Sequence, residues 1–296
     1  MAGTSLQINC YPMVSTAKQY ISRSNPGRRS LLFRPIKVAS VASQSQSSYW
    51  DSLNVDIEAY LKKAIPIRPP LTVFEPMHHL VFDAPPSLAP ALCIAACEFV
   101  GGGRDQAMVA AAAVRLMHAA ACAHDKLLSA HKPISRPTAQ REFESNIKLL
   151  TGDGIVPFGF ELLASEPERS NAGRVVRVVA EIARAVGSQG TVEGQYEEVV
   201  SERMERACEK REGELHACAG ACGAILGGGS EEEVEKLRKY GLYVGMMQGM
   251  LRLGGKERFG EMVERMRCLA LNELRDFDGR KIETLSKLVE PDFCCA

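Results

Sequence analysis

Apolar residues recur every three or four positions from residue 49 almost to the C-terminus, and this repeat constrains the fold more than any other feature. Val175, Val178, Val179, Ile182 and Val186 follow it, with Arg and Glu between them. The same spacing recurs over residues 234–244 and 262–274. Such spacing places apolar side chains on one face of a helix. Because no alternating strand pattern extends beyond a few residues, the sequence predicts a single all-α domain of about ten helices over residues 49–296.

Clusters of Pro and Gly predict where these helices end. They fall at residues 66–70, 84–90, 101–103, 133–137, 152–159, 227–229 and 254–255. Ser230, followed by three glutamates, predicts a capped helix N-terminus with acids in its first turn. Nine alanines between residues 107 and 123 predict a helix that packs closely against its neighbours.

The first 48 residues differ in composition from the rest of the chain. They contain no Asp or Glu, six Lys or Arg, and ten Ser. This composition is typical of an organelle transit peptide, and the apolar core of a secretory signal is missing. We therefore predict that residues 1–48 are a transit peptide and that the folded domain, residues 49–296, begins at Tyr49-Trp50-Asp51.

The remaining residues exclude two broad classes of function. They carry 30 basic and 36 acidic side chains, and this net charge of −6 argues against binding to nucleic-acid phosphates. No stretch approaches the length of uninterrupted apolar sequence that a transmembrane helix needs, so no membrane span is expected.

Two of the cysteine pairs have the spacing Cys-x-x-x-Cys, namely Cys93 with Cys97 and Cys218 with Cys222. On a helix the Cβ atoms of such pairs lie about 5–6 Å apart, which is farther than the roughly 3.5–4.5 Å of a disulfide. A zinc site stays possible, although no His or acid stands at a supporting spacing. The spacing by itself favours a third interpretation, in which the thiols are small apolar groups that let helices approach closely.

Four segments, in a fixed order, carry a resemblance to a known family. They are Leu92–Gly102, Leu116–Asp125 (LMHAAACAHD), Leu150–Phe160 (LTGDGIVPFGF) and Gly187–Gln195 (GSQGTVEGQ). In this order they resemble the short-chain trans-prenyl diphosphate synthases, and the likeness covers residues 49–293. The resemblance implies an all-α isoprenoid synthase-type bundle around a central cavity. In that family two Asp-rich boxes hold Mg²⁺, which prefers carboxylate and phosphate oxygens, and a basic segment holds the second diphosphate.

Each part of that apparatus is altered in this chain. The first box retains Asp125, but Lys126 and His131 stand at its other positions. Gln248 is followed by Gly-Met-Leu-Arg, without an acid, where the second box belongs. Residues 85–89 lack the Lys and Arg of the basic segment. The resemblance therefore implies no catalytic residue, no metal ligand and no cofactor in this chain. We interpret the polar residues that survive at or near family positions as capping or cavity-edge residues: Asp125, Asp153, Gln195 and Lys210.

A retained fold with lost boxes resembles the type I small subunits of plant heteromeric geranyl diphosphate synthases. This implies a non-catalytic regulatory subunit, located in the chloroplast stroma, that binds a geranylgeranyl diphosphate synthase large subunit as a heterodimer or heterotetramer. It would shift the output of that partner toward geranyl diphosphate for monoterpene biosynthesis, and Mg²⁺ is expected on the partner.

By the same resemblance, four cysteines are implicated at the partner interface: Cys93, Cys97, Cys218 and Cys222. We also expect the Ala-rich helix over residues 107–123 and its neighbours to contribute to that interface. Two alternatives stay open: a weakly active prenyltransferase in its own right, and a thiol- or zinc-based regulatory protein.

Overall fold

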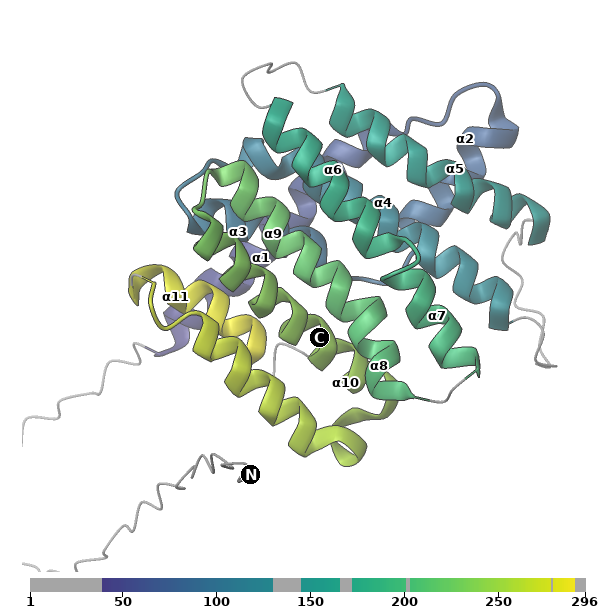
Figure 1. Ribbon diagram of the computed structural model, residues 1–296. Coiled ribbons are helices and arrows are strands. Elements are labelled where there is room, and N and C mark those ends of the chain that lie inside the picture. Colours follow the sequence, from purple (N-terminus) through teal and green to yellow (C-terminus); the bar gives the residue numbers. More distant parts are fainter. Residues whose placement is uncertain (1–38, 130–144, 166–171, 201–202, 278, 291–296) are drawn as a thin grey trace, which may run out of the picture.

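The described residues of the computed structural model are 39–129, 145–165, 172–200, 203–277 and 279–290, and they contain helices and no strand (Figure 1). The all-α prediction of about ten helices is confirmed. In chain order the helices are α1 (Ala39–Ala64), α2 (Leu71–Phe82), α3 (Ala89–Phe99), α4 (Arg104–Ser129), α5 (Ser145–Ala164), α6 (Ala172–Val186), α7 (Thr191–Val200), α8 (Met204–Cys208), the π-helix η2 (Glu209–Gly213), α9 (Glu214–Gly227), α10 (Glu231–Glu273), α11 (Gly279–Ser286) and the short 3₁₀-helix η3 (Lys287–Val289).

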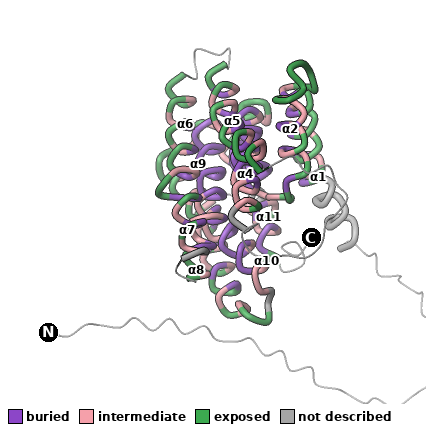
Figure 2. Tube along the Cα trace, turned by 90° about the vertical axis from the view of Figure 1, so that its right-hand side faces the viewer, coloured by how far each residue is buried: buried purple, intermediate pink, exposed green. Residues whose placement is uncertain are grey.

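Helices α4 and α9 form the centre of the bundle. α4 contacts α3, α5 and α9, while α9 also contacts α3, α6 and α10. Figure 2 shows their buried residues lying inside a layer of partly exposed helices. Ala107 and the run Ala110–Ala113 are fully buried within the chain itself. These alanines let the surrounding helices of the same chain approach α4, and the expectation that this helix and its neighbours contribute to a partner interface stays a prediction.

By length and composition, residues Arg104–Leu127 of α4 could cross a membrane. However, 78% of the apolar window is buried inside the fold. The segment is apolar because it is the core helix of the bundle.

Glycines bring α9 close to both α3 and α10. A Cβ at Gly223 would lie 2.0 Å from the carbonyl oxygen of Cys93 in α3. A Cβ at Gly241 of α10 would lie 2.2 Å from the carbonyl oxygen of His216 in α9. Both distances are far below van der Waals contact, so only glycine allows the helix backbones to pack at this separation.

Several predicted helix ends are confirmed. Gly101 and Gly228 have φ of +102° and +83°, which glycine adopts readily, and each lies just after a helix. Ser230 caps α10: its Oγ accepts from the backbone N–H of Glu233, and the Glu233 carboxylate accepts from the backbone N–H of Ser230. The predicted break at residues 133–137 lies outside the described residues.

Two predicted breaks are wrong. α5 continues through residues 152–159, and α10 continues through residues 254–255. In α5 the glycines serve helix packing, since a Cβ at Gly152 would lie 2.6 Å from His124 Nε2 and one at Gly159 would lie 2.8 Å from Met117 Cε, both in α4. Tertiary contacts with α4 thus outweigh the low helix propensity of these residues.

The N-terminal helix is anchored at Tyr49 and Trp50. The Tyr49 hydroxyl donates to Glu98 at 2.6 Å, and Arg104 donates to Glu98 at 3.1 Å and to Asp56 at 2.6 Å. Trp50 is buried in the core. Helix α1 begins at Ala39, ten residues before the predicted domain start, and residues 1–38 of the predicted transit peptide lie outside the described residues.

Candidate functional site

Asp125, the acid that survives from the first box, is bound by side chains from two other elements. Gln195 of α7 donates through Nε2 to Asp125 Oδ1 at 2.9 Å and to the Ala121 carbonyl at 3.2 Å. Arg211 of η2 donates to Asp125 Oδ2. Both carboxylate oxygens of Asp125 therefore already have donors from the same chain.

Arg211 connects Asp125 to a second acid. Its other guanidinium nitrogen donates to Glu198 of α7, so one cation lies between two carboxylates. The Arg211 side chain is 13% exposed, and those of Asp125 and Glu198 are 23% and 34% exposed. Burial raises the pKa of Asp125 above its ordinary value, and the Arg211 charge opposes part of that rise. The guanidinium thus stabilises a largely desolvated carboxylate.

A second guanidinium lies where the second box belongs. Arg252, four residues after Gln248 in α10, donates to the buried carboxylate of Glu212 in η2. Gln248 itself is half-buried, and residues 249–252 contribute no acid. Arg211 and Glu212 are adjacent residues of the π-helix, whose turns are wider than those of an α-helix. Arg211 bonds to Asp125 of α4, and Glu212 bonds to Arg252 of α10.

These residues do not fit the Mg²⁺ ions that the family resemblance would lead one to expect. Mg²⁺ needs free carboxylate oxygens, but those of Asp125 are bonded to Arg211 and Gln195. The Lys126 side chain is exposed, and His131 lies outside the described residues. Within the described ranges, no three His, Cys, Asp or Glu side chains gather closely enough to hold a metal.

The other polar residues at family positions have structural partners. Asp153 of α5 lies 3.3 Å from His124 of α4. Lys210 donates to the Gln189 carbonyl at 3.0 Å and lies 3.4 Å from the Glu193 carboxylate. These contacts hold α5 to α4 and α7 to η2.

A cavity of about 480 Å³ lies beside this cluster, at the level of the loop between α2 and α3. It is lined by residues of seven elements (α1, α2, α3, α4, η2, α9 and α10) and that loop: Asn54, Ile57, Glu58, Leu61, Phe82, Pro86, Ser87, Leu88, Pro90, Arg115, His118, Glu212, His216, Gln248 and Arg252. The loop is the segment in which the basic residues of the family are missing. The cavity therefore coincides with the position expected for the second diphosphate.

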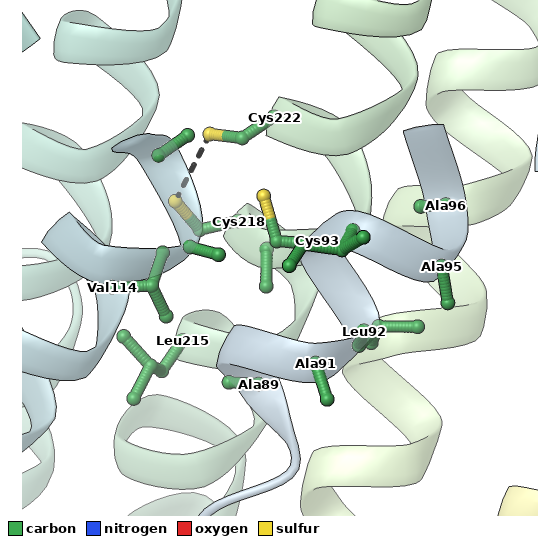
Figure 3. Close-up of a cluster of buried hydrophobic side chains, with 14 of the residues drawn as sticks. Ala89, Ala91, Leu92, Cys93, Ala95, Ala96, Val114, Leu215, Cys218 and Cys222 are labelled. Carbon is green, nitrogen blue, oxygen red and sulfur yellow. Dashed lines mark hydrogen bonds between the residues drawn. The ribbon is translucent and has the colours of Figure 1, made fainter. Parts of the chain in front are cut away.

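The two cysteine pairs lie inside the chain rather than on its surface. Cys93 and Cys97 belong to α3, Cys218 and Cys222 belong to α9, and all four are buried. Figure 3 shows Cys93, Cys218 and Cys222 pointing into one cluster with Leu92, Val114 and Leu215. All four cysteines are free, and the Sγ atoms of Cys218 and Cys222 are 3.7 Å apart.

Burial disfavours the reactive thiolate form of three of these cysteines. It raises the pKa of Cys97 to about 11. The pKa of Cys93 is raised well above its usual value by burial, and that of Cys222 by its hydrogen bond to Cys218 together with burial. A protonated thiol is neither a nucleophile nor a metal ligand, so the arrangement disfavours a redox or zinc switch. The interface role of the four cysteines stays a prediction, and it would have to act through the packing of α3 on α9.

The sequence reasoning missed the residues that define this site. Arg211 and Glu212 stand in the run Glu-Lys-Arg-Glu-Gly-Glu, directly before the mostly apolar residues 215–227. When a helix carries charged side chains on all of its faces and some of these faces are buried, the buried charges are expected to form internal ion pairs. Their partners, Asp125 and Arg252, are 86 and 40 residues away, so spacing along the chain could not have identified the pairs.

The fold and the site define an isoprenoid synthase-type helical protein in which the chain's own guanidinium groups bind the acids around the former metal boxes. Residues 72–248, more than half of the chain, match the polyprenyl synthetase family, and the chain belongs to that family.

Proteins of known assembly are similar over most of the chain. A chloroplastic small subunit 2 of heterodimeric geranylgeranyl pyrophosphate synthase from Cannabis sativa is 46% identical over 82% of this chain and 91% of its own length. The geranyl diphosphate synthase small subunit from Antirrhinum majus superimposes with a TM-score of 0.75 at 51% identity, covering 82% of this chain and 98% of that one.

A chain from a mint heterotetrameric geranyl pyrophosphate synthase has a TM-score of 0.73 at 48% identity, with coverages of 82% and 98%. These relatives confirm the predicted resemblance to small subunits of plant prenyl synthases. The predicted plastid localisation agrees with the chloroplastic location of the Cannabis relative.

Proposed function

We propose that this chain is a non-catalytic regulatory subunit that assembles with a catalytic geranylgeranyl diphosphate synthase in the plastid and shifts its products toward geranyl diphosphate. The observation that carries the proposal is the Arg211–Asp125 pair. A guanidinium bonded to the surviving box acid leaves no open carboxylate for Mg²⁺, and ionisation of an allylic diphosphate depends on such a metal. The heteromeric relatives from Cannabis, snapdragon and mint support the assembly.

The surface offers an apolar face for a partner. Leu149 and Leu150 of α5 and Val176 of α6 are exposed, and α5 and α6 contact each other along the side that Figure 1 shows in front of α4. Isolated apolar side chains are common on surfaces, but several on adjoining helices are typical of an interface. Stable interfaces of obligate type bury roughly 2,000–5,000 Å², so such an interface would have to extend over both helices.

The shift in product length would arise on the partner. The chain replaces one protomer of a catalytic dimer, so the packing of its α5 and α6 helices sets the shape of the partner's adjoining helices. If this loosens or shortens the partner's product cavity, the ten-carbon product leaves before further extension.

The test is one assay run in two states. The full chain is given Mg²⁺, dimethylallyl diphosphate and isopentenyl diphosphate, first alone and then co-purified with a plant geranylgeranyl diphosphate synthase. We expect no product alone and a larger ten-carbon fraction in the complex than with the partner by itself. Turnover by the isolated chain, or an unchanged product distribution in a stable complex, would refute the proposal.

A surface variant tests the interface independently of the products. Val176→Asp places a charge in the proposed interface and should weaken association at least tenfold, as measured by analytical ultracentrifugation, without lowering the melting temperature. Val73→Asp, at another exposed valine on α2, is the matched control and should associate normally.

A further inference from the structure

We propose that the cavity between α1, the 85–88 loop, α4 and α10 binds a neutral, mostly apolar molecule with one hydrogen-bonding group, such as a prenyl alcohol, and rejects prenyl diphosphates. This goes beyond the subunit function, because it assigns this chain a ligand of its own. The cavity volume of about 480 Å³ lies within the usual range of small-molecule sites.

The walls provide an apolar chamber. Ile57 and Leu61 line it from α1, Phe82 from the end of α2, Leu88 from the loop before α3 and Pro90 from the first turn of α3. A hydrocarbon chain that enters this space exchanges contact with water for contact with these side chains. Burial of apolar surface is the general source of affinity in such a site.

The charged side chains in the walls already have hydrogen-bond or ionic partners. Arg115 of α4 donates to three backbone carbonyls, those of Pro85 at 2.7 Å, Ala84 at 2.9 Å and Val81 at 3.3 Å. Arg252 is paired with Glu212. The remaining acid, Glu58, lies 2.5 Å from Lys62. A diphosphate in this cavity would find no cation without a partner among the described residues that line it.

The two lining histidines are neutral. His118 lies 3.0 Å from the Pro85 carbonyl, and burial lowers its pKa to about 4. His216 donates from Nδ1 to the Glu212 carbonyl at 2.7 Å, and burial lowers its pKa as well. That bond leaves His216 Nε2 as a buried acceptor without a well-formed hydrogen bond in the described structure, with the Gln248 amide beside it.

This inner end of the cavity suits a hydroxyl group. The Gln248 amide offers both a donor and an acceptor. A small shift of this amide would also leave His216 Nε2 free to accept a hydrogen bond from the ligand. A neutral alcohol can satisfy these groups without bringing a charge out of water. A diphosphate would have to draw Arg115 away from its carbonyls, or Arg252 away from Glu212, to gain a counter-charge, and this costs the hydrogen bonds or the ion pair already formed.

The test compares two probes that share one hydrocarbon chain, geraniol and geranyl diphosphate, titrated into the full chain by isothermal calorimetry with melting temperatures in parallel. We expect geraniol to bind and to raise the melting temperature, and geranyl diphosphate to bind at least tenfold more weakly. Equal or tighter binding of the diphosphate, or no binding of geraniol, would overturn the proposal.

Variants place the site. Leu88→Trp fills the cavity and should abolish geraniol binding, whereas Leu71→Trp, the same change at an exposed position of α2, should leave it intact. Ser87→Lys adds a cation without a partner to the wall and should strengthen diphosphate binding at least tenfold relative to geraniol. The proposal would be contradicted if Leu88→Trp still bound geraniol, or if Ser87→Lys left the preference for geraniol over geranyl diphosphate unchanged. All of these readouts are ligand binding to this chain alone, so they fail or succeed independently of partner assembly.

Discussion

Replacing Arg211 by methionine removes the cation between Asp125 and Glu198 while keeping most of the side-chain volume. Exposed ion pairs contribute about 0–1 kcal/mol, and removing one partner of a fully buried pair costs about 3–5 kcal/mol. The Arg211 side chain is 13% exposed and its partners are 23% and 34% exposed, so the pair lies between these limits. We expect a loss of about 2 kcal/mol, which for a domain of this size lowers the melting temperature by about 4–8 °C.

The pH dependence of this loss tests its cause. The pKa of Asp125 is already raised by burial, and removing Arg211 raises it further. An acid whose pKa is higher in the folded than in the unfolded chain destabilises the fold when ionised and stops doing so once the pH falls below its folded pKa. The difference between Arg211→Met and the wild type should therefore be largest near pH 7 and smaller near pH 5.

The assay is thermal or urea unfolding followed by circular dichroism at several pH values. Arg206→Met is the matched control, since Arg206 is 45% exposed and pairs with Glu193 on the surface of the same region. It should cost less than about 1 kcal/mol. An equal loss in both variants, or a loss for Arg211→Met that does not change with pH, would refute the view that Arg211 compensates a buried carboxylate.

Four further outcomes follow from the same structure. Millimolar Mg²⁺ should leave the melting temperature of the wild-type chain unchanged, and a clear rise would mean that box carboxylates are open to metal. Gly223→Ala should cost at least about 3 kcal/mol or prevent folding, because its Cβ would lie 2.0 Å from the Cys93 carbonyl oxygen; Gly173→Ala, at a position with open space, is the control and should be near neutral. A thiol reagent should modify exposed Cys268 before the four paired cysteines, whose labelling should require unfolding; early labelling of the pairs would show that α3 and α9 separate in the native chain. Truncation to Tyr49 should leave the melting temperature unchanged, whereas truncation past Trp50 should cost about 3–5 kcal/mol, and equal stability of both truncated chains would contradict the anchoring role of these residues.

Much of the fold could be predicted from local patterns. Apolar residues three and four positions apart define helix faces whatever the partner of each helix is, and the Ser230 cap and the glycine turns at 101 and 228 depend on neighbouring residues alone. The predicted break in α5 failed because a distant contact decided the outcome. The glycines at 152–159 would end an isolated helix, but in the bundle they allow α5 to approach His124 and Met117 of α4.

For the site, the sequence by itself determined which acids are missing from the two boxes, because a residue type is visible without any structure. Only the tertiary structure decided what replaces them. Arg211 meets Asp125 across 86 residues, and Arg252 meets Glu212 across 40, because η2 lies between α4, α7 and α10. In the same way, the spacing of the cysteines placed each pair on one helix face, but only the packing of α3 on α9 determined that this face is buried. Ion pairs and burial depend on distances through space, which the order of residues along the chain does not fix.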